Sequence, residues 1–492
     1  MAGTFSRSLI VVYTANGLNG LLSAIAVPLA IRTMGLSGYG LFSIYLLLVS
    51  YNMLADLGVG KNLLRLLAQG GPAETREHHL RVAAGLYVVL CGAWLVASPL
   101  LALAVPRYIF PVEARFMAAV RWMVVLSVLE FAAGVPISLM QTACVAAQRF
   151  DAYARFTFVS GLLRNGAILS AAVVFRDPIA VAAVLVARKT IELPLAAKLL
   201  GGLPAAGCRP LFDVRRFRGM LGQSTSLAAA QLLNCTVMGV GSPLVNAVFG
   251  LEALGIYRAA FDLAGKITFI SNGIGLVVFP RAARYFSSSA ADTAPRLPAI
   301  LHASVAMYTS LVAITVIAGP HVLSATGLTQ TTVQLFALLS VAMGLNAHSL
   351  LGNELIQAAG RYGRSICYGA CALLAQIAIF LIMDRRAGTM AIGWAWIGAA
   401  LISACVSDAL TLTLSNTARF DQVRSIAVKC AAVCACVGLV LYVFGAVSAI
   451  PAVLCGLMIA ALLLFALRVV MPLLHTGEPK RVPAEPIAPI YV

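Results

Sequence analysis

The sequence predicts an all-α polytopic membrane protein with about 14 transmembrane helices, arranged as two parallel six-helix repeats followed by two further helices. Hydrophobic residues make up 61% of the 492 positions and charged residues only 11%, whereas a soluble domain carries about 25% charged residues. The apolar residues form continuous runs of about 20 residues, the length that a spanning helix needs. In addition, the sequence around Gly35 recurs around Gly250.

The first six predicted spans contain almost uninterrupted apolar residues. Such runs indicate helices, because the strands of a membrane barrel alternate between apolar and polar residues. Residues 1–7 lack the small-residue cleavage site of a secretory signal, so the first span is expected to be retained. These spans are residues 8–34, 40–67, 82–105, 117–147, 157–175 and 179–200.

The remaining spans follow with short connections, and no long polar segment separates a soluble module. Spans seven to twelve are residues 221–249, 256–280, 298–318, 332–358, 365–383 and 389–414, and the two extra helices are residues 425–447 and 450–470. The predicted organisation is therefore an N-terminal half at 1–205, a C-terminal half at 206–416, two extra helices at 417–471 and a tail at 472–492.

The distribution of basic residues predicts the orientation, because Lys and Arg concentrate in cytoplasmic segments. With a cytoplasmic N-terminus, 23 of the 35 basic residues fall on the cytoplasmic side and 8 on the other side. This count places Lys429, near the start of the thirteenth span, on the cytoplasmic side. Both termini are thus predicted to be cytoplasmic. Topology and contact with anionic membrane lipid explain the net charge of +17, and no soluble basic face exists to bind nucleic acid.

An internal repeat relates the two halves. "MGLSGYGLFSIY" at 34–45 and "FGLEALGIYRAA" at 249–260 match at a shift of 215 positions, the separation of Gly35 and Gly250. A second pair, "AAQRF" at 146–150 and "AAGRY" at 358–362, closes the fourth and tenth spans. Six spans per half is an even number, so both halves enter from the same side. Parallel repeats of this kind are typical of transporters whose bundles rock around a central site, although an old duplication that now serves only packing is the alternative.

Each half also carries a proline in its leading helix, Pro28 and Pro243. Proline removes a backbone donor and kinks a helix, so this matched pair is predicted to act as hinges. A static bend filled by a neighbouring helix is the other interpretation.

Polar side chains occupy matching positions on the same two helices. Asn16 and Asn19 in the first span correspond to Gln231 and Asn234 in the seventh. We expect the two leading helices to face each other across a shared polar space and to contribute these residues to a substrate cavity. The alternative is that the amides bond helices to each other.

Basic side chains inside the spans are the candidates for binding an anionic headgroup. Lys61 and Arg65 are four residues apart on one helical face, so they repel each other unless they share an anion. A phosphate or pyrophosphate group fits this pair, and snorkelling to ordinary lipid phosphates is the alternative. The other candidates of this kind are Arg164, Arg188, Lys189 and Lys266.

Several of these cations have acidic neighbours one helical turn away. Arg188 with Glu192, and Asp262 with Lys266, are spaced as i and i+4, and such couples are as often structural as functional. If the charges of Arg188 and Glu192 neutralise each other, Lys189 is left as the unneutralised charge of this span.

Three in-span carboxylates have no partner nearby in the sequence. They are therefore candidates for the site of a coupled proton or cation, and they are Asp56, Glu130 and Asp408.

No motif of enzymatic chemistry accompanies these groups. Ten of the eleven cysteines lie in apolar runs, where free Cys packs as a small apolar residue, so neither disulfides nor a metal site is expected. The chain contains no Gly-x-x-x-x-Gly-Lys-Ser/Thr loop, which makes ATP hydrolysis unexpected. We therefore predict a protein without a cofactor that is not an enzyme.

These features resemble a known superfamily. The paired "GL…YGL" after the first span, "DLG" at 56–58 with glycines at 58 and 60, and "QRF" at 148–150 are similar to the polysaccharide-transporter branch of the multidrug/oligosaccharidyl-lipid/polysaccharide (MOP) flippase superfamily. The resemblance extends over the whole chain.

The resemblance implies a V-shaped, alternating-access flippase of the bacterial inner membrane, driven by an ion gradient. Its expected substrate is an undecaprenyl-pyrophosphate-linked oligosaccharide for surface polysaccharide. A polysaccharide polymerase and a chain-length regulator are the partners that it implies. A multidrug or cation antiporter of the same superfamily is the main alternative; it would favour acidic residues in the spans, whereas this chain favours basic ones.

Overall fold

The computed structural model describes residues 2–52, 59–68, 72–147, 149–200, 209–213, 217, 229–268, 297–412 and 419–444, and in these residues the regular structure is helical throughout. The helices are α1 (Ala2–Asn52), α2 (Val59–Ala68), α3 (Ala73–Ala104), η2 (Val105–Ile109), α4 (Ala114–Ala146), α5 (Phe150–Phe175), α6 (Pro178–Leu200), α8 (Gly241–Ala264), η4 (Gly265–Ile267), α10 (Leu297–Ala325), α11 (Gln330–Ala358), α12 (Tyr362–Ala387), η6 (Gly388–Met390), α13 (Ala391–Leu412) and α14 (Arg419–Val443). Residues 229–239 are also helical and lead into α8.

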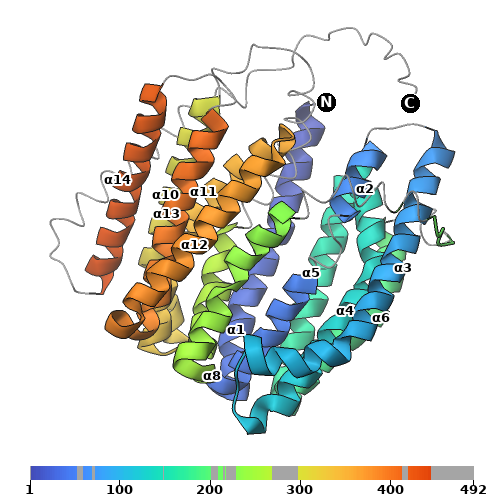
Figure 1. Ribbon diagram of the computed structural model, residues 1–492, viewed down its shortest axis with the longest axis horizontal. Coiled ribbons are helices and arrows are strands. Elements are labelled where there is room, and N and C mark those ends of the chain that lie inside the picture. Colours follow the sequence, from blue (N-terminus) through green and yellow to red (C-terminus); the bar gives the residue numbers. More distant parts are fainter. Residues whose placement is uncertain are drawn as a thin grey trace.

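The helices form two groups that meet at α1 and α8. Figure 1 shows α2 to α6 gathered on one side and α10 to α14 on the other, with α1 and α8 between them. In the first group α1 packs against α4, α5 and α6, and it also packs against α8. In the second group α11 packs against α8, α10, α12 and α13, and α14 covers α10 and α13. Nine helices of the described part are long and apolar enough to cross a membrane.

The repeated sequence has the same conformation in both halves. Gly35 has φ 74° and ψ 169°, and Gly250 has φ 82° and ψ −176°, while the residues around each glycine are helical. Only glycine adopts such positive φ without a steric penalty, which explains why glycine stands at both positions. The predicted loop between the first two spans is therefore one residue long, and the next span continues directly from it.

These two breaks bring equivalent residues of the halves into reciprocal contact. A Cβ atom on Gly40 would lie 2.5 Å from the carbonyl oxygen of Leu251 and 3.3 Å from the nitrogen of Gly255. A Cβ atom on Gly255 would lie 3.0 Å from the carbonyl carbon of Leu36 and 3.4 Å from the nitrogen of Gly40. Because each glycine contacts its counterpart across the pair, a local two-fold axis between the halves passes through this crossing, which we call the glycine crossing.

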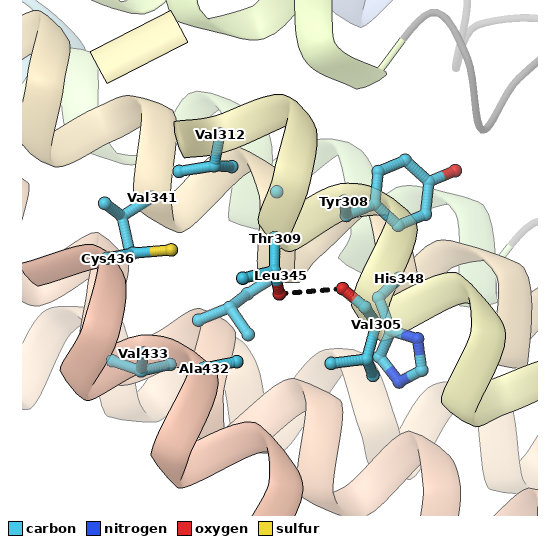
Figure 2. Close-up of a pocket in the computed structure, with 11 residues that line it drawn as sticks. Val305, Tyr308, Thr309, Val312, Val341, Leu345, His348, Ala432, Val433 and Cys436 are labelled. Atoms are coloured by element: carbon cyan, nitrogen blue, oxygen red, sulfur yellow. Dashed lines mark hydrogen bonds between the residues drawn. The ribbon is translucent and has the colours of Figure 1, made fainter. Parts of the chain in front are cut away.

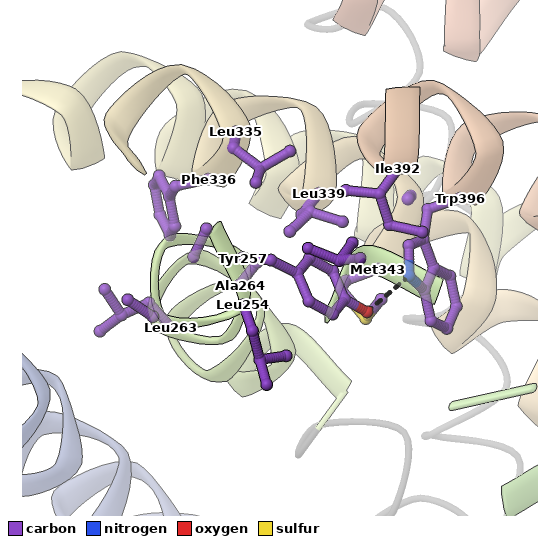
Figure 3. Packing of buried hydrophobic residues seen from close by; sticks show 14 of the residues in the cluster. Leu254, Tyr257, Leu263, Ala264, Leu335, Phe336, Leu339, Met343, Ile392 and Trp396 are labelled. Atoms are coloured by element: carbon purple, nitrogen blue, oxygen red, sulfur yellow. Dashed lines mark hydrogen bonds between the residues drawn. The ribbon is translucent and has the colours of Figure 1, made fainter. Parts of the chain in front are cut away.

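The second group is built around α11, most of whose apolar window is buried inside the protein. Figure 3 shows Phe336, Leu339 and Met343 of α11 packed against Tyr257 of α8 and Trp396 of α13. The indole nitrogen of Trp396 donates a hydrogen bond of 3.0 Å to the Tyr257 hydroxyl. This bond satisfies the polar ends of two buried aromatic rings and fixes α13 against α8.

The predicted spans agree with the observed helices to within a few residues where both are described, apart from some helix ends. Helix α3 begins at Ala73, nine residues before the predicted start, and α14 begins at Arg419, six residues before its predicted start. Lys429 lies inside α14, as the predicted span 425–447 also places it, and its side chain is buried; its assignment to the cytoplasmic side stays a prediction. Residues 450–470, the predicted fourteenth span, lie outside the described residues, and the four-part division of the chain stays a prediction.

Candidate functional site

A polar cavity of about 350 Å³ lies between the two groups of helices. Its walls come from α1, α4 and α5 on one side and from the end of α8 with η4 on the other. The charged groups that line it are Arg164 of α5, Asp262 of α8 and Lys266 of η4. Tyr153 of α5 and Asn19 of α1 add uncharged polar groups to the wall. The volume falls within the range of small-ligand sites, about 300–1,000 Å³.

The acidic group of this cavity already has partners within the protein. One carboxylate oxygen of Asp262 accepts a bond of 2.7 Å from the Arg258 guanidinium, and the other accepts a bond of 2.9 Å from the Tyr39 hydroxyl. Asp262 forms an ion pair with Arg258, one turn from it in the direction opposite to Lys266, the partner that sequence spacing had suggested. Arg164 and Lys266 therefore give the described part of the cavity a positive balance.

Asn19 holds two helices together and leaves a polar atom at the cavity wall. Its amide nitrogen donates a bond of 3.0 Å to the backbone oxygen of Thr157 on α5. The amide oxygen of Asn19 is buried and has no hydrogen-bond partner among the described residues. Buried polar atoms usually have a partner, so this atom is suited to a bound ligand or water.

A buried ionic network lies behind the cavity and joins three helices. Glu130 of α4 accepts from the Tyr45 hydroxyl of α1 and pairs with Arg188 of α6 at 3.4 Å. Arg188 also pairs with Glu192 at 3.3 Å, and Lys189 pairs with Glu192 at 3.0 Å. The two acids and two bases of this network balance. We call this set the α4–α6 network.

The α4–α6 network changes the interpretation of three predicted site residues. Arg188 is buried between two carboxylates, and Lys189 is not a spare charge because it pairs with Glu192. Glu130 does have partners, although they lie 85 and 58 residues away in the sequence. Such a network stabilises the packing of α1, α4 and α6, because removal of one buried charge would leave another uncompensated.

A second buried polar cluster lies in the other half. Asp408 of α13 pairs with Lys429 of α14 and with Nε2 of His348 on α11, the latter at 2.9 Å. Nδ1 of His348 lies 2.6 Å from the Ser304 hydroxyl of α10. We call these four residues the His348 cluster. Figure 2 shows the His348 ring beside a small cavity lined by α10, α11 and α14.

The His348 cluster contains Ser, His and Asp but does not have the geometry of a nucleophilic triad. In such a triad serine bonds to Nε2 and aspartate to Nδ1, whereas the two nitrogens are exchanged here. Ser304 is also buried, so no substrate reaches its hydroxyl from the surface. Among the described residues, no three His, Cys, Asp or Glu side chains come together as metal ligands would.

The predicted site residues therefore fall into six sets. Asn19, Arg164 and Lys266 line the cavity, and Glu130, Arg188 and Lys189 form the network behind it. Gln231 and Asn234 are half-buried on the helix before α8 but do not line this cavity, and Asp408 belongs to the His348 cluster. Pro28 is buried within α1 and Pro243 lies in the first turn of α8, while the breaks in helical geometry occur at Gly35 and Gly250. Asp56 and the side chains of Asn16, Lys61 and Arg65 lie outside the described residues.

Sequence reasoning missed Tyr39, Tyr45, His348 and Lys429 as members of these polar sites. The tyrosines resemble interfacial aromatic residues in a sequence, and only the folded chain shows the carboxylates that their hydroxyls contact. The i, i+4 spacing of Arg258 and Asp262 was available as a signal, but Lys266 offered an equal one on the other side.

Comparison with known proteins gives a fold and no family. No protein-family model and no curated protein matches the sequence. Among solved structures, the chain is similar to the lipid II flippase MurJ in an inward closed conformation, with TM-score 0.64 and 10% identity over 95% of this chain and 100% of that one. It is also similar to the MATE multidrug transporter DinF-BH, with TM-score 0.63 and 12% identity over 83% and 94% of the two chains.

A third similar structure is an inward-facing multidrug resistance MATE family transporter of the MOP superfamily, with TM-score 0.58 and 14% identity over 85% and 98%. These matches confirm the predicted fold class: the chain has the helical, multi-pass fold that these solved structures share. At these identities they show the fold alone.

Proposed function

We propose that this protein is a flippase that moves an undecaprenyl-pyrophosphate-linked oligosaccharide across the bacterial inner membrane for surface polysaccharide synthesis. The observation that carries the proposal is the cavity between the two halves, where Arg164 and Lys266 face a shared space while the one acidic group, Asp262, is engaged by Arg258 and Tyr39. Two basic groups in a partly dehydrated site favour a multiply charged anion over a neutral or cationic solute.

The chemistry of the cavity suits each part of such a substrate. Arg164 and Lys266 would bind the pyrophosphate, and Asn19, Gln141 and Tyr153 would bond to sugar hydroxyls. We propose that Lys61 and Arg65 of α2, which the sequence places on one helical face, attract the headgroup before it enters. The polyprenyl tail would remain in the bilayer.

The glycine crossing supports alternating access as the mechanism. The two halves contact each other there through backbone atoms, so the contact is narrow and can separate without extracting large interlocked side chains. We propose that the halves rock about this region, with Pro28 and Pro243 absorbing part of the bending. A coupled ion would bias the motion. Of the three carboxylates that the sequence predicts for it, we propose Asp56 and Asp408, because Glu130 already accepts from Tyr45 and pairs with Arg188.

One observation favours the second candidate, a multidrug or cation antiporter. Asp262 does line the cavity, and the MATE transporters share the fold. In that function the Asp262 carboxylate would release Arg258 and bind a cationic substrate in its place. The two candidates therefore differ in the sign of the charge that the cavity binds.

Transbilayer movement by the purified protein distinguishes the two functions. Proteoliposomes would contain a fluorescent undecaprenyl-pyrophosphate disaccharide, and a membrane-impermeant quencher would report how much probe reaches the outer leaflet. We expect the protein to accelerate this movement. Arg164→Ala with Lys266→Ala should lower the rate at least tenfold, because each charge-assisted hydrogen bond contributes about 1.5–3 kcal/mol.

The matched control is Arg155→Ala with Lys198→Ala, which removes the same charges from exposed positions on α5 and α6 outside the cavity. Its rate should stay within about twofold of the unmodified protein. No movement of the lipid probe, together with uptake of an organic cation against a pH gradient, would favour the antiporter instead.

A further inference from the structure

The His348 cluster has a feature that the other buried polar groups lack: its ring can gain a proton without losing a hydrogen bond. The hydroxyl of Ser304 lies 2.6 Å from Nδ1 of His348 and 2.8 Å from the carbonyl oxygen of Leu301. On the other side, Nε2 of His348 lies 2.9 Å from a carboxylate oxygen of Asp408. Ser304 therefore has two acceptors within reach of its single hydrogen.

Both protonation states of the ring are satisfied by this arrangement. In the neutral ring, Nε2–H donates to Asp408 and Nδ1 accepts the hydrogen of the Ser304 hydroxyl. When Nδ1 takes up a proton, the new N–H donates to the Ser304 oxygen, and the hydroxyl hydrogen turns to the Leu301 carbonyl. One proton is added to the cluster, no covalent bond between heavy atoms changes, and each donor keeps an acceptor.

The charges around the ring allow this change. Asp408 and Lys429 balance each other, so the cluster has a net charge of zero with a neutral ring and +1 with a charged ring. The Asp408 carboxylate contacts the ring directly, which favours the charged form, whereas Lys429 on the same carboxylate opposes it. The effects of Asp408 and Lys429 on the ring therefore oppose each other, so neither the neutral nor the charged ring is fixed by its neighbours.

Other titratable groups on the packed helices do not duplicate this arrangement. Tyr308 of α10 and Cys436 of α14 line the small cavity beside the ring. On the remaining neighbours of α11, Arg258 pairs with Asp262, Arg364 of α12 donates to the Leu410 carbonyl, Tyr368 is buried on α12, and Lys266 lines the larger cavity.

A small cavity lies next to the ring. The small cavity has a volume of about 20 Å³ and is lined by His348, Tyr308 and Thr309. A cavity of about 10–15 Å³ is large enough for one water molecule, so a water can stand against this face of the cluster. Figure 2 shows how α14 closes the cavity through Ala432, Val433 and Cys436.

Glu130 is a poorer proton acceptor by the same reasoning. Its two oxygens accept from Tyr45 and pair with Arg188. A proton on either oxygen would displace one of these donors and leave the buried Arg188 with less compensation. Glu130 is therefore suited to remain ionised within the α4–α6 network.

We propose that the His348 cluster is a proton-binding site, in which the imidazole of His348 carries the proton and Ser304 and Asp408 position the ring for both states. Proton binding can be tested on the protein alone. The further role, that this proton drives transport, rests on the proposed function. Lys429 is the residue that α14 contributes to the cluster. A charged His348 ring competes with Lys429 for the Asp408 carboxylate, so protonation of the ring weakens the Lys429–Asp408 ion pair and with it the packing of α14 on the second half.

The test is a pH titration of the full-length protein in nanodiscs with ¹⁵N-labelled histidine, followed by NMR. The spectrum distinguishes the two neutral tautomers from the charged ring. Signals of His348 are identified by their loss in His348→Gln, and the exposed His321 on α10 serves as the internal reference. We expect the Nε2–H tautomer at high pH and uptake of one proton between about pH 5 and 9. A ring that keeps one charge state over this range would overturn the proposal.

Two variants test the assignment of the surrounding charges. Asp408→Asn should move the His348 titration to lower pH by one unit or more, while His321 is unchanged. Because Asp408→Asn leaves Lys429 buried without its carboxylate, the double variant Asp408→Asn with Lys429→Met removes both neighbouring charges, and its His348 titration should lie between those of the unmodified protein and Asp408→Asn. A titration that is indifferent to both variants would contradict the proposed site.

The transport role has a separate readout. In the proteoliposome assay, an imposed pH gradient should change the rate of lipid-probe movement in the unmodified protein, and His348→Gln should abolish that response. An equal response in His348→Gln would overturn the assignment of the coupling proton to His348. If no lipid probe moves at all, the proposed function fails while the NMR titration still decides proton binding.

Discussion

Replacing Gly40 by alanine at the glycine crossing should shift the protein away from the conformation described above. The added Cβ atom would lie 2.5 Å from the Leu251 carbonyl oxygen, well inside ordinary van der Waals contact. Backbone atoms cannot move aside as the end of a side chain can, so the halves must separate slightly. Overpacking of this kind typically costs about 1–3 kcal/mol.

That cost raises the free energy only of the conformation in which the two halves touch at the glycine crossing. It therefore favours the conformation in which the halves are separated. At about 1.4 kcal/mol per tenfold change, a cost of about 2 kcal/mol shifts the population ratio about 30-fold toward the state with separated halves. The helix itself loses nothing, since alanine is a better helix former than glycine at a residue with helical geometry.

Pulsed electron paramagnetic resonance can measure the shift. Spin labels at Tyr108, after α3, and Thr329, before α11, report the distance between the two groups of helices, and both residues are exposed. In a cysteine-free background, Gly40→Ala should increase the population of the longer distance. Gly17→Ala is the matched control on the same helix, because a Cβ there meets no atom within 4 Å. An unchanged distance distribution in Gly40→Ala would refute the role of the crossing as a contact between moving halves.

Three further predictions concern charge and packing. Arg188→Met should lower the free energy of unfolding by about 3–5 kcal/mol because Glu130 and Glu192 stay buried, and Glu130→Gln in the same chain should recover part of the loss in a thermal melt. Removal of charge at both Lys61 and Arg65 should reduce export of the lipid-linked glycan while the amount of protein in the membrane stays normal. Unchanged export would show that the two side chains only contact ordinary lipid phosphates. Trp396→Phe should destabilise the protein by about 1 kcal/mol through the lost bond to the Tyr257 hydroxyl, and a melting temperature equal to that of the unmodified protein would contradict this.

The helices were predictable because membrane spans are set by local sequence. Uninterrupted apolar runs predicted α4, α5, α6 and α11 to within a few residues at most of their ends. The repeat also identified Gly35 and Gly250 as equivalent positions, and their matching φ and ψ values agree with that. The one-residue length of the break at Gly35 was not predictable, because Gly35, Gly38 and Gly40 lie within six residues and equally suggest a longer turn.

The partners of the charged groups were much less predictable, because most of them come from distant parts of the chain. Glu130 meets Tyr45 across 85 residues, and Asp408 meets His348 across 60. Lys429 lies inside the predicted span 425–447, which contains no acidic residue that could indicate its partner. The buried lysine is tolerated because its ammonium pairs with Asp408 and donates to the Ala404 carbonyl, which is a property of the packing and not of the local sequence.

The central claim, export of a lipid-linked glycan through the cavity between the halves, is tested most directly in cells that lack this protein. We predict that lipid-linked repeat units accumulate in the cytoplasmic leaflet, and that the unmodified protein restores export. Arg164→Ala with Lys266→Ala should fail to restore it, whereas the matched Arg155→Ala with Lys198→Ala should succeed. Normal surface glycan in the deletion strain, with no second protein of this kind present, would contradict the account.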